Sequence, residues 1–270
     1  MLIEILAAGL LVGLLLGVLG GGGGVLTVPI LVYLLGETPQ HATAASLVIV
    51  GVTALVGATT RVRSRLVDWR TGLTFGALGI PTAYLGTVVN RHLDPLVLLL
   101  AFAALIVVVA VAMLVNTCRE TSADDGVTER AATGSGGGAA IDVRPGRTVT
   151  ALKVVGSALV IGFLTGLLGV GGGFLIVPAL VFALQMPMAS AIGTSLLVIA
   201  VTSAASTVSR IGVVEFDWPV IIPFTLAAVG ATVAGKRVAD RFSGDALTRA
   251  FAVLLILVAG FVTVQSVTAL

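Results

Sequence analysis

The sequence predicts an all-α integral membrane protein built from two inverted repeats of about four apolar segments each. Three observations lead to this fold class. The 270 residues are 57% hydrophobic and only 10% charged, whereas a soluble domain carries about 25% charged residues. Apolar stretches of membrane-spanning length recur along the chain. Finally, the second half of the chain repeats the first half.

Eight apolar stretches define the expected segments. Most are about 20 residues long, which is the length of a helix that crosses a bilayer core of about 30 Å. The first and the fifth are too long for one ordinary span, and these two contain glycine runs, so the count is eight, or eight to ten if broken segments are counted separately. The stretches cover residues 2–35, 42–60, 71–90, 95–116, 148–184, 189–209, 218–235 and 246–266.

A polar segment divides the chain. Residues 117–147 are rich in Gly, Ser, Thr and Asp, a composition typical of flexible linkers. We therefore expect a first membrane repeat at 1–116, a flexible cytoplasmic linker at 117–147 and a second membrane repeat at 148–270. The first apolar segment carries Glu4 and lacks a basic region before it, so we expect a retained segment and not a cleaved signal peptide.

The internal repeat is exact in length, because a shift of 149 residues aligns the two halves without a gap. The stretch Leu19–Leu31, "LGGGGGVLTVPIL", then matches Leu168–Leu180, "LGVGGGFLIVPAL", at nine of thirteen positions. The same shift pairs Ser46 with Ser195, Thr53 with Thr202, Arg61 with Arg210, and Asp68-Trp69 with Asp217-Trp218.

The distribution of Lys and Arg favours an inverted repeat. Cytoplasmic loops of membrane proteins carry an excess of these residues. If all eight stretches cross once, the fifteen Lys and Arg residues divide ten to five between the two sides. If the two glycine-broken stretches instead enter and return, the division becomes thirteen to two. The second arrangement makes the halves inverted, with both termini outside; a plain eight-helix arrangement is the alternative.

The glycine runs are the best candidates for a substrate site. A broken helix exposes free backbone N–H groups at the start of its second half, and the helix dipole adds positive charge there. Such a terminus binds an anion without a buried Lys or Arg. The alternative is that the glycines permit close helix packing, as the spacing of Gly9, Gly13 and Gly17 does. The candidate residues are Gly20, Gly22, Gly23, Gly24 and Pro29, with Gly169, Gly171, Gly172, Gly173 and Pro178.

Small hydroxyl residues open the second span of each half. Thr43 and Ser46 lie in "HATAASL", and Thr194 and Ser195 lie in "SAIGTSL". Their hydroxyl groups are candidate donors to an anion near the glycine breaks. The alternative is that each hydroxyl bonds a carbonyl of its own helix or of a neighbouring helix.

Arg61 and Arg210 occupy equivalent positions near the end of the second span in each half. In the inverted arrangement they lie at opposite membrane faces, where each would attract an anion to one mouth. The alternative is that both are interfacial anchors.

The dipeptides Asp68-Trp69 and Asp217-Trp218 follow these arginines. We expect the tryptophans in an aromatic belt, and the aspartates as helix caps or as partners of the arginines.

Signatures of catalysis are missing from the sequence. It has no intramembrane Ser/His/Asp set, no His/Cys metal spacing and no GxxxxGK[ST] motif, so we expect neither an enzyme nor a metal or cofactor site. The net charge of +2 gives no indication of nucleic-acid binding. Cys118 is the single cysteine, which leaves no intrachain disulfide.

The paired "LGxGGGxLxVPxL" elements, each followed by a "TSL"-like helix start and a basic "R…DW" loop, resemble the sulfite exporter TauE/SafE family of membrane permeases. The resemblance covers the whole chain apart from the linker. It implies a multi-pass plasma-membrane protein that moves sulfite, sulfonates or related sulfur-containing anions, usually outward. It also implies functional roles for the glycine–proline elements. The first half departs from the pattern, because Ala45 stands where the second half has Thr194.

Together these features predict a secondary transporter, an exporter of small oxyanions that works by alternating access around glycine-broken helices. The expected partners are the lipid bilayer, a small anionic substrate and protons as a coupling ion; a homo-oligomer also fits the sequence. Two other classes stay open, a passive anion channel and a non-transporting membrane scaffold.

Overall fold

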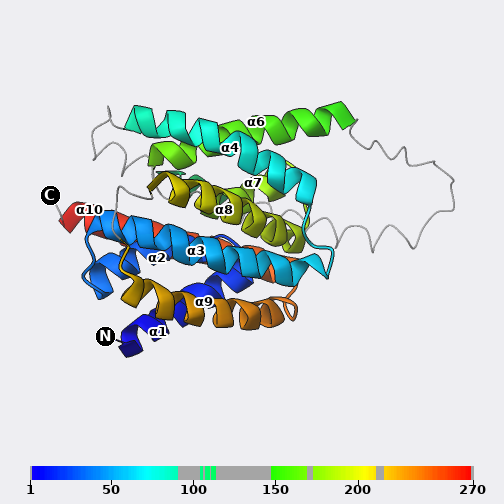
Figure 1. The fold of residues 1–270 in the computed structure, drawn as a ribbon. Coiled ribbons are helices and arrows are strands. Elements are labelled where there is room, and N and C mark those ends of the chain that lie inside the picture. The colour runs from blue at the N-terminus through cyan, green and yellow to red at the C-terminus, as the bar shows by residue number, and fades with distance from the viewer. Residues whose placement is uncertain are drawn as a thin grey trace, which may run out of the picture.

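The computed structural model of the protein describes residues 2–90, 104–105, 107–109, 111–113, 147–168, 173–210 and 216–268. Every regular element within these ranges is a helix (Figure 1). Four of the helices are long and apolar enough to span a membrane: Leu2–Leu19, His41–Val62, Met188–Val208 and Trp218–Ala239. Large apolar side chains such as Leu226 and Leu257 are exposed on the outside of the bundle, which suits a lipid environment. The chain is therefore an all-helical, multi-pass membrane protein.

The first apolar stretch is broken, as its glycine run predicts. Helix α1 covers Leu2–Leu19, helix α2 covers Gly22–Pro29 and a π-helix, η1, covers Ile30–Leu34. Gly20 has a φ of +79°, a conformation that only glycine adopts at little cost. The change to π-helical hydrogen bonding directly follows Pro29, which has no N–H to donate.

The remaining helices follow the other apolar stretches closely. In the first half, α3 covers Pro39–Val62 and α4 covers Trp69–Asn90. In the second half, the helices are α6 (Arg147–Leu168), α7 (Gly173–Phe182), α8 (Met188–Arg210), α9 (Trp218–Ala239) and α10 (Gly244–Thr268). The predicted linker at 117–147, apart from its last residue, and most of the stretch 95–116 lie outside the described residues.

One of the two predicted aspartate caps is observed. Asp68 Oδ1 accepts hydrogen bonds from the backbone N–H groups of Arg70 and Thr71 at 3.0 and 3.2 Å, which satisfies two of the four unpaired donors at the start of α4. Asp217 precedes α9 but makes no side-chain cap hydrogen bond. Trp69 and Trp218 are both about half exposed, as residues of an aromatic belt would be.

The helices form two layers, and each layer contains one helix that comes from the other half of the sequence. Helix α9 packs extensively against α1 and also against α3, whereas α4 packs against α6 and α8. Figure 1 shows α1, α3 and α9 together on one side, and α4, α6 and α8 on the other. We call these the α1–α3–α9 layer and the α4–α6–α8 layer. They meet where α3 packs against α8 and where α2 contacts α7.

Glycines create the tight contact within each layer. A Cβ on Gly13 of α1 would collide with the backbone of Ala228 in α9. A Cβ on Gly162 of α6 would likewise collide with Thr82 and with the backbone of Gly79 in α4. The shift of 149 residues converts the first pair of helix positions into the second. The two layers therefore make the same close contact at equivalent positions.

Helices α3 and α8 run antiparallel where the layers meet. Gly51 of α3 lies against Ser203 of α8, and Gly57, further along α3, lies against Leu196, which is earlier in α8. These two helices occupy equivalent places in the two halves, so the equivalent helices point in opposite directions.

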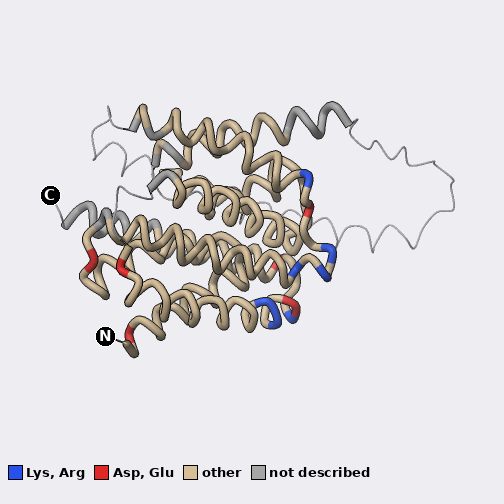
Figure 2. Tube along the Cα trace, viewed as in Figure 1, with Lys and Arg blue, Asp and Glu red and all other residues tan. Residues whose placement is uncertain are grey.

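Charged residues are segregated along the bundle. Figure 2 shows Lys and Arg gathered at one end, where α3 leads into α4 and α9 leads into α10. This end holds Arg63, Arg65, Arg70, Lys236, Arg237 and Arg241. The beginning of α1 lies toward the opposite end, as does the turn between η1 and α3 (Figure 1). The basic end corresponds to the side that the Lys and Arg count assigns to the cytoplasm.

Candidate functional site

The broken helices of the two halves meet in the interior. A Cβ on Gly21, the residue before α2, would overlap the carbonyl oxygen of Gly173, the first residue described in α7. A Cβ on Gly173 would lie 3.3 Å from the carbonyl oxygen of Gly21. The backbones at the starts of α2 and α7 are thus in direct contact. We call residues 20–24 and Gly173 the glycine centre.

The start of α2, in the glycine centre, has unpaired backbone donors of the kind that suit an anion. Gly21, the N-cap residue of α2, has no side chain that could accept from the first backbone N–H groups of this helix. The partial positive charges of the α2 and α7 dipoles add at the point where the two helices begin. A small oxyanion is therefore a chemically suitable ligand.

Ser195 is the predicted hydroxyl residue that reaches the glycine centre. It is completely buried, and a Cβ on Gly20 would lie 2.8 Å from its Oγ. The hydroxyl donates to the carbonyl of Ile192 at 2.9 Å. A serine hydroxyl has one proton, so it must leave this carbonyl in order to donate to an anion. Its first-half equivalent, Ser46, is also buried and donates to the carbonyl of Thr43 at 2.9 Å.

Thr194 lies against a different element. Its Oγ1 accepts a hydrogen bond from the backbone N–H of Asp68 at 3.1 Å, and its methyl group is close to Gly72 at the start of α4. This threonine therefore attaches α8 to the turn before α4. Thr43 is half-buried near the start of α3.

The predicted glycine and proline residues lie at different places around the break. A Cβ on Gly22 would meet Leu254 of α10, and a Cβ on Gly23 would meet Val12 and Leu16 of α1. Around Gly24 the space is open except for Val50, 3.6 Å from such a Cβ. Pro29 ends α2 and Pro178 is buried in α7. Gly169, Gly171 and Gly172 lie outside the described residues, as does the side chain of Arg210.

Arg61 is buried, and its environment was not predicted from the sequence. Its side chain is 2% exposed, and its Nη2 donates a 2.6 Å hydrogen bond to the carbonyl of Gly17 in the last turn of α1. That carbonyl is one of the four that a helix C-terminus leaves unpaired, and it carries negative dipole charge. Arg61 therefore stabilises the end of α1, three residues before the helix break at Gly20.

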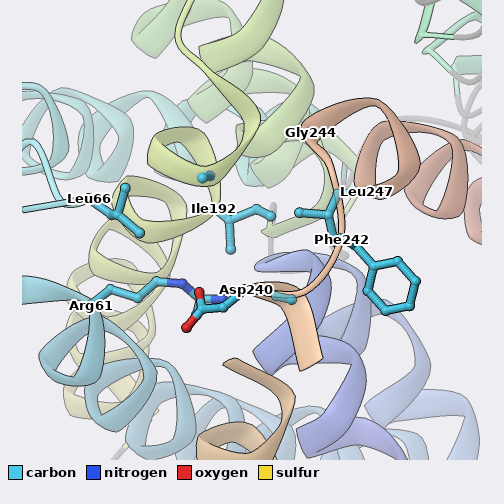
Figure 3. Close-up of a pocket in the computed structure, with 9 residues that line it drawn as sticks. Arg61, Leu66, Ile192, Asp240, Phe242, Gly244 and Leu247 are labelled. Atoms are coloured by element: carbon cyan, nitrogen blue, oxygen red, sulfur yellow. The ribbon is translucent and has the colours of Figure 1, made fainter. Parts of the chain in front are cut away.

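A cavity of about 230 Å³ opens beside Arg61, between α3, α8 and the turn from α9 to α10 (Figure 3). Its other charged lining residue is Asp240, which attracts Arg61 electrostatically. Arg61 Nη1 is buried and has no hydrogen-bond partner among the described residues. Most of the lining is apolar, from Leu66, Ala189, Ile192, Ala239, Phe242 and Leu247. We call this space the Arg61 cavity.

Ile192 connects the Arg61 cavity with the glycine centre. Its side chain lines the cavity, and it also lies 2.9 Å from the position of a Cβ on Gly20. The sequence offered one indirect signal for this residue, its place one turn before Ser195. Within the described ranges, no group of three or more His, Cys, Asp and Glu residues is arranged to hold a metal ion.

Comparison with known proteins identifies the family. The model of the family "Sulfite exporter TauE/SafE" matches residues 5–262. A "Probable membrane transporter protein" of Xylella fastidiosa (strain 9a5c) is 32% identical over 268 residues, 98% of this chain and 96% of the relative. The "Probable membrane transporter protein YunE" of Bacillus subtilis (strain 168) is 27% identical over 87% of this chain and 86% of its own length. No solved structure gives a significant match. The chain, with its apolar helices and glycine-broken segment, belongs to the sulfite exporter TauE/SafE family and is a membrane transporter.

Proposed function

We propose that this protein is a secondary transporter that exports small oxyanions, such as sulfite, sulfonates or related sulfur-containing anions, across the plasma membrane. The contact between Gly21 and Gly173 is the observation that supports this most directly. It brings two half-helix N-termini together in the interior, where their dipoles attract negative charge. The family to which the chain belongs provides the substrate class.

The proposed topology is an inverted repeat of residues 1–116 and 148–270. The repeated glycine contacts within the two layers and the antiparallel packing of α3 and α8 support it. In this topology α1 and α2 form a hairpin that enters the membrane and returns, and α6 and α7 do the same from the other side. The Lys- and Arg-rich end shown in Figure 2 faces the cytoplasm.

Alternating access then comes from relative motion of the two layers. The halves cannot rock as separate sequence units, because α1 is packed on α9 and α6 on α4. The α1–α3–α9 layer moves against the α4–α6–α8 layer instead, along the interface of α3 with α8. The glycine centre lies between the layers, so the movement changes its access from one side of the membrane to the other.

Proton coupling follows from the chemistry of the substrate. If a weakly basic anion such as sulfite leaves deprotonated and takes up a proton on the more acidic outer side, the pH gradient favours export without a carboxylate at the described residues of the glycine centre. Ser195 orients the anion by transferring its hydrogen bond from the Ile192 carbonyl to an anionic oxygen.

The test is the flux of radiolabelled sulfite and sulfate in proteoliposomes, with and without a pH gradient. We expect saturable sulfite flux that Ser195→Ala reduces about tenfold, because one charge-assisted hydrogen bond is lost. Ser157→Ala is a matched control: this α6 serine bonds the carbonyl three residues earlier in the same way, and its first-half equivalent is Ala8. Unitary currents would identify a channel instead. No flux from folded protein would refute the transport of these anions.

A further inference from the structure

We propose that the Arg61 cavity is a second anion site, a vestibule in which Arg61 Nη1 binds the oxyanion before it passes Ile192 to the glycine centre. The inference rests on the proposed transport function and adds to it a binding residue, a gating residue and an order of events. The vestibule lies at the basic end of the bundle, so in the proposed topology it receives the anion from the cytoplasm.

The two terminal nitrogens of the Arg61 guanidinium have different surroundings. Nη2 is committed to the Gly17 carbonyl at 2.6 Å, which fixes the side chain in position. Nη1 is buried and has no hydrogen-bond partner in the described part of the chain, and the Arg61 side chain lines the cavity. A buried and unpaired donor on a charged group is unfavourable. An anionic oxygen in the cavity would satisfy it with a charge-assisted hydrogen bond.

The surroundings favour an anion over other ligands. The cavity lining is mainly apolar. Few polar side chains other than that of Arg61 would therefore interact with a bound anion, and the local dielectric is low. Asp240 is the opposing charge, but its side chain is half exposed and lies 3.9 Å from Lys236 Nζ. Lys236 in turn donates to Ser64 at 3.1 Å in the turn after α3. The basic residues around this end raise the local concentration of anions.

Ile192 separates the two sites. It lines the cavity, as Figure 3 shows, and it also packs on Gly20. Its β-branched side chain has few rotamers, so it has little freedom to turn aside without a shift of α8 relative to α1. The equivalent position in the first half is Thr43, which is smaller and polar. The apolar barrier is therefore not repeated in the first half.

The first experiment measures equilibrium binding of radiolabelled sulfite to the full-length protein in lipid nanodiscs. Asp240→Asn removes the charge that repels the anion, and we expect the Kd to fall about fivefold. Asp245→Asn removes the same charge from the exposed first turn of α10, outside the cavity lining, and should leave the Kd unchanged. Equal Kd values for the wild type and Asp240→Asn would overturn the proposal.

Arg61→Gln should weaken sulfite binding at least about tenfold, because it removes the charge that binds the anion. This variant also loses the hydrogen bond to Gly17 and is interpreted only if the purified protein is monodisperse. If it does not fold, the Asp240→Asn result decides the question, because the proposal predicts a gain in affinity for that variant. A folded Arg61→Gln protein with wild-type affinity would overturn the proposal.

The gate is tested by flux. Ile192→Ala should raise the maximal rate of sulfite flux about threefold, because a barrier between the two sites is lowered. Ile222→Ala shortens a lipid-facing isoleucine and should leave the rate unchanged. An unchanged or lower rate for Ile192→Ala would refute the role of Ile192.

The binding and flux results together separate the vestibule from the transport function. If Asp240→Asn strengthens sulfite binding but the wild type shows no flux, the vestibule is supported and transport is refuted. If the wild type transports sulfite but Asp240→Asn leaves the Kd unchanged, transport is supported and the vestibule is refuted.

Discussion

Replacement of Gly21 by alanine tests the contact on which the proposed site depends. The new methyl group would overlap the carbonyl oxygen of Gly173. A backbone oxygen cannot turn aside as a flexible side chain can, so α2 and α7 must move apart. Overpacking of this kind costs about 1–3 kcal/mol, and here the separation also disrupts the alignment of the two helix dipoles.

Gly24→Ala is the control for stability, because Gly24 lies three residues further along, in the first turn of α2. Its methyl group would meet only Val50, 3.6 Å away, and alanine is favoured over glycine inside a helix by about 1 kcal/mol. For a chain of this size 1 kcal/mol corresponds to about 2–4 °C in Tm. We therefore expect Gly21→Ala to lower Tm by about 5 °C and Gly24→Ala to leave it unchanged or slightly higher.

The assay heats each protein at a series of temperatures and measures the fraction that still elutes as a monodisperse peak in size exclusion, which gives Tm. Sulfite flux is then measured well below the lower Tm. Gly21→Ala should lose most of its flux even where it is fully folded, because the anion site is distorted. A Gly21→Ala protein with wild-type Tm and wild-type flux would show that the starts of α2 and α7 are not in contact.

Three further predictions follow from the helix contacts and the charge distribution. Gly13→Ala should destabilise the protein by about 1–3 kcal/mol through its clash with α9, whereas Gly230→Ala, with nothing within 4 Å, should stabilise it by up to about 1 kcal/mol; thermal unfolding compares the two. Asp68→Ala should cost about 1 kcal/mol by removing the cap of α4, seen as a lower Tm. In a cysteine-free background, a membrane-impermeant maleimide should label Glu37→Cys but not Asp245→Cys in intact cells. The opposite labelling would refute the proposed orientation.

The sequence was sufficient to predict features that depend on local chemistry. The helix break at Gly20 follows from glycine conformation, and the cap of α4 follows from an aspartate before a helix. The close packing of α1 follows from the spacing of Gly9, Gly13 and Gly17, each of which faces the backbone of α9.

Features that depend on distant parts of the chain were not predicted. The burial of Arg61 was not predicted, because it depends on a hydrogen bond to a carbonyl 44 positions earlier. The contact of Thr194 with the turn before α4 was also not predicted, because its hydroxyl accepts from a backbone group 126 positions away; its role as an anion ligand stays a prediction. No periodicity in the sequence encodes such pairings. Ile192 gave only an indirect signal, its place one turn before Ser195, because an isoleucine in an apolar helix is normally explained by packing.

The exchange of α4 and α9 between the halves restricts the movements available to the transporter. Separating the sequence halves would break the contact of Gly13 with α9 and that of Gly162 with α4, both of which bring backbones together. Sliding one layer along the other preserves both contacts and disturbs α3 against α8, α2 against α7 and the contacts of α10, which touches α8 as well as α1 and α2. The glycine centre lies at the second of these interfaces. In the proposed mechanism, a movement that opens access to the anion therefore also shifts the α2 terminus relative to the α7 terminus, so anion affinity and access would change in the same step.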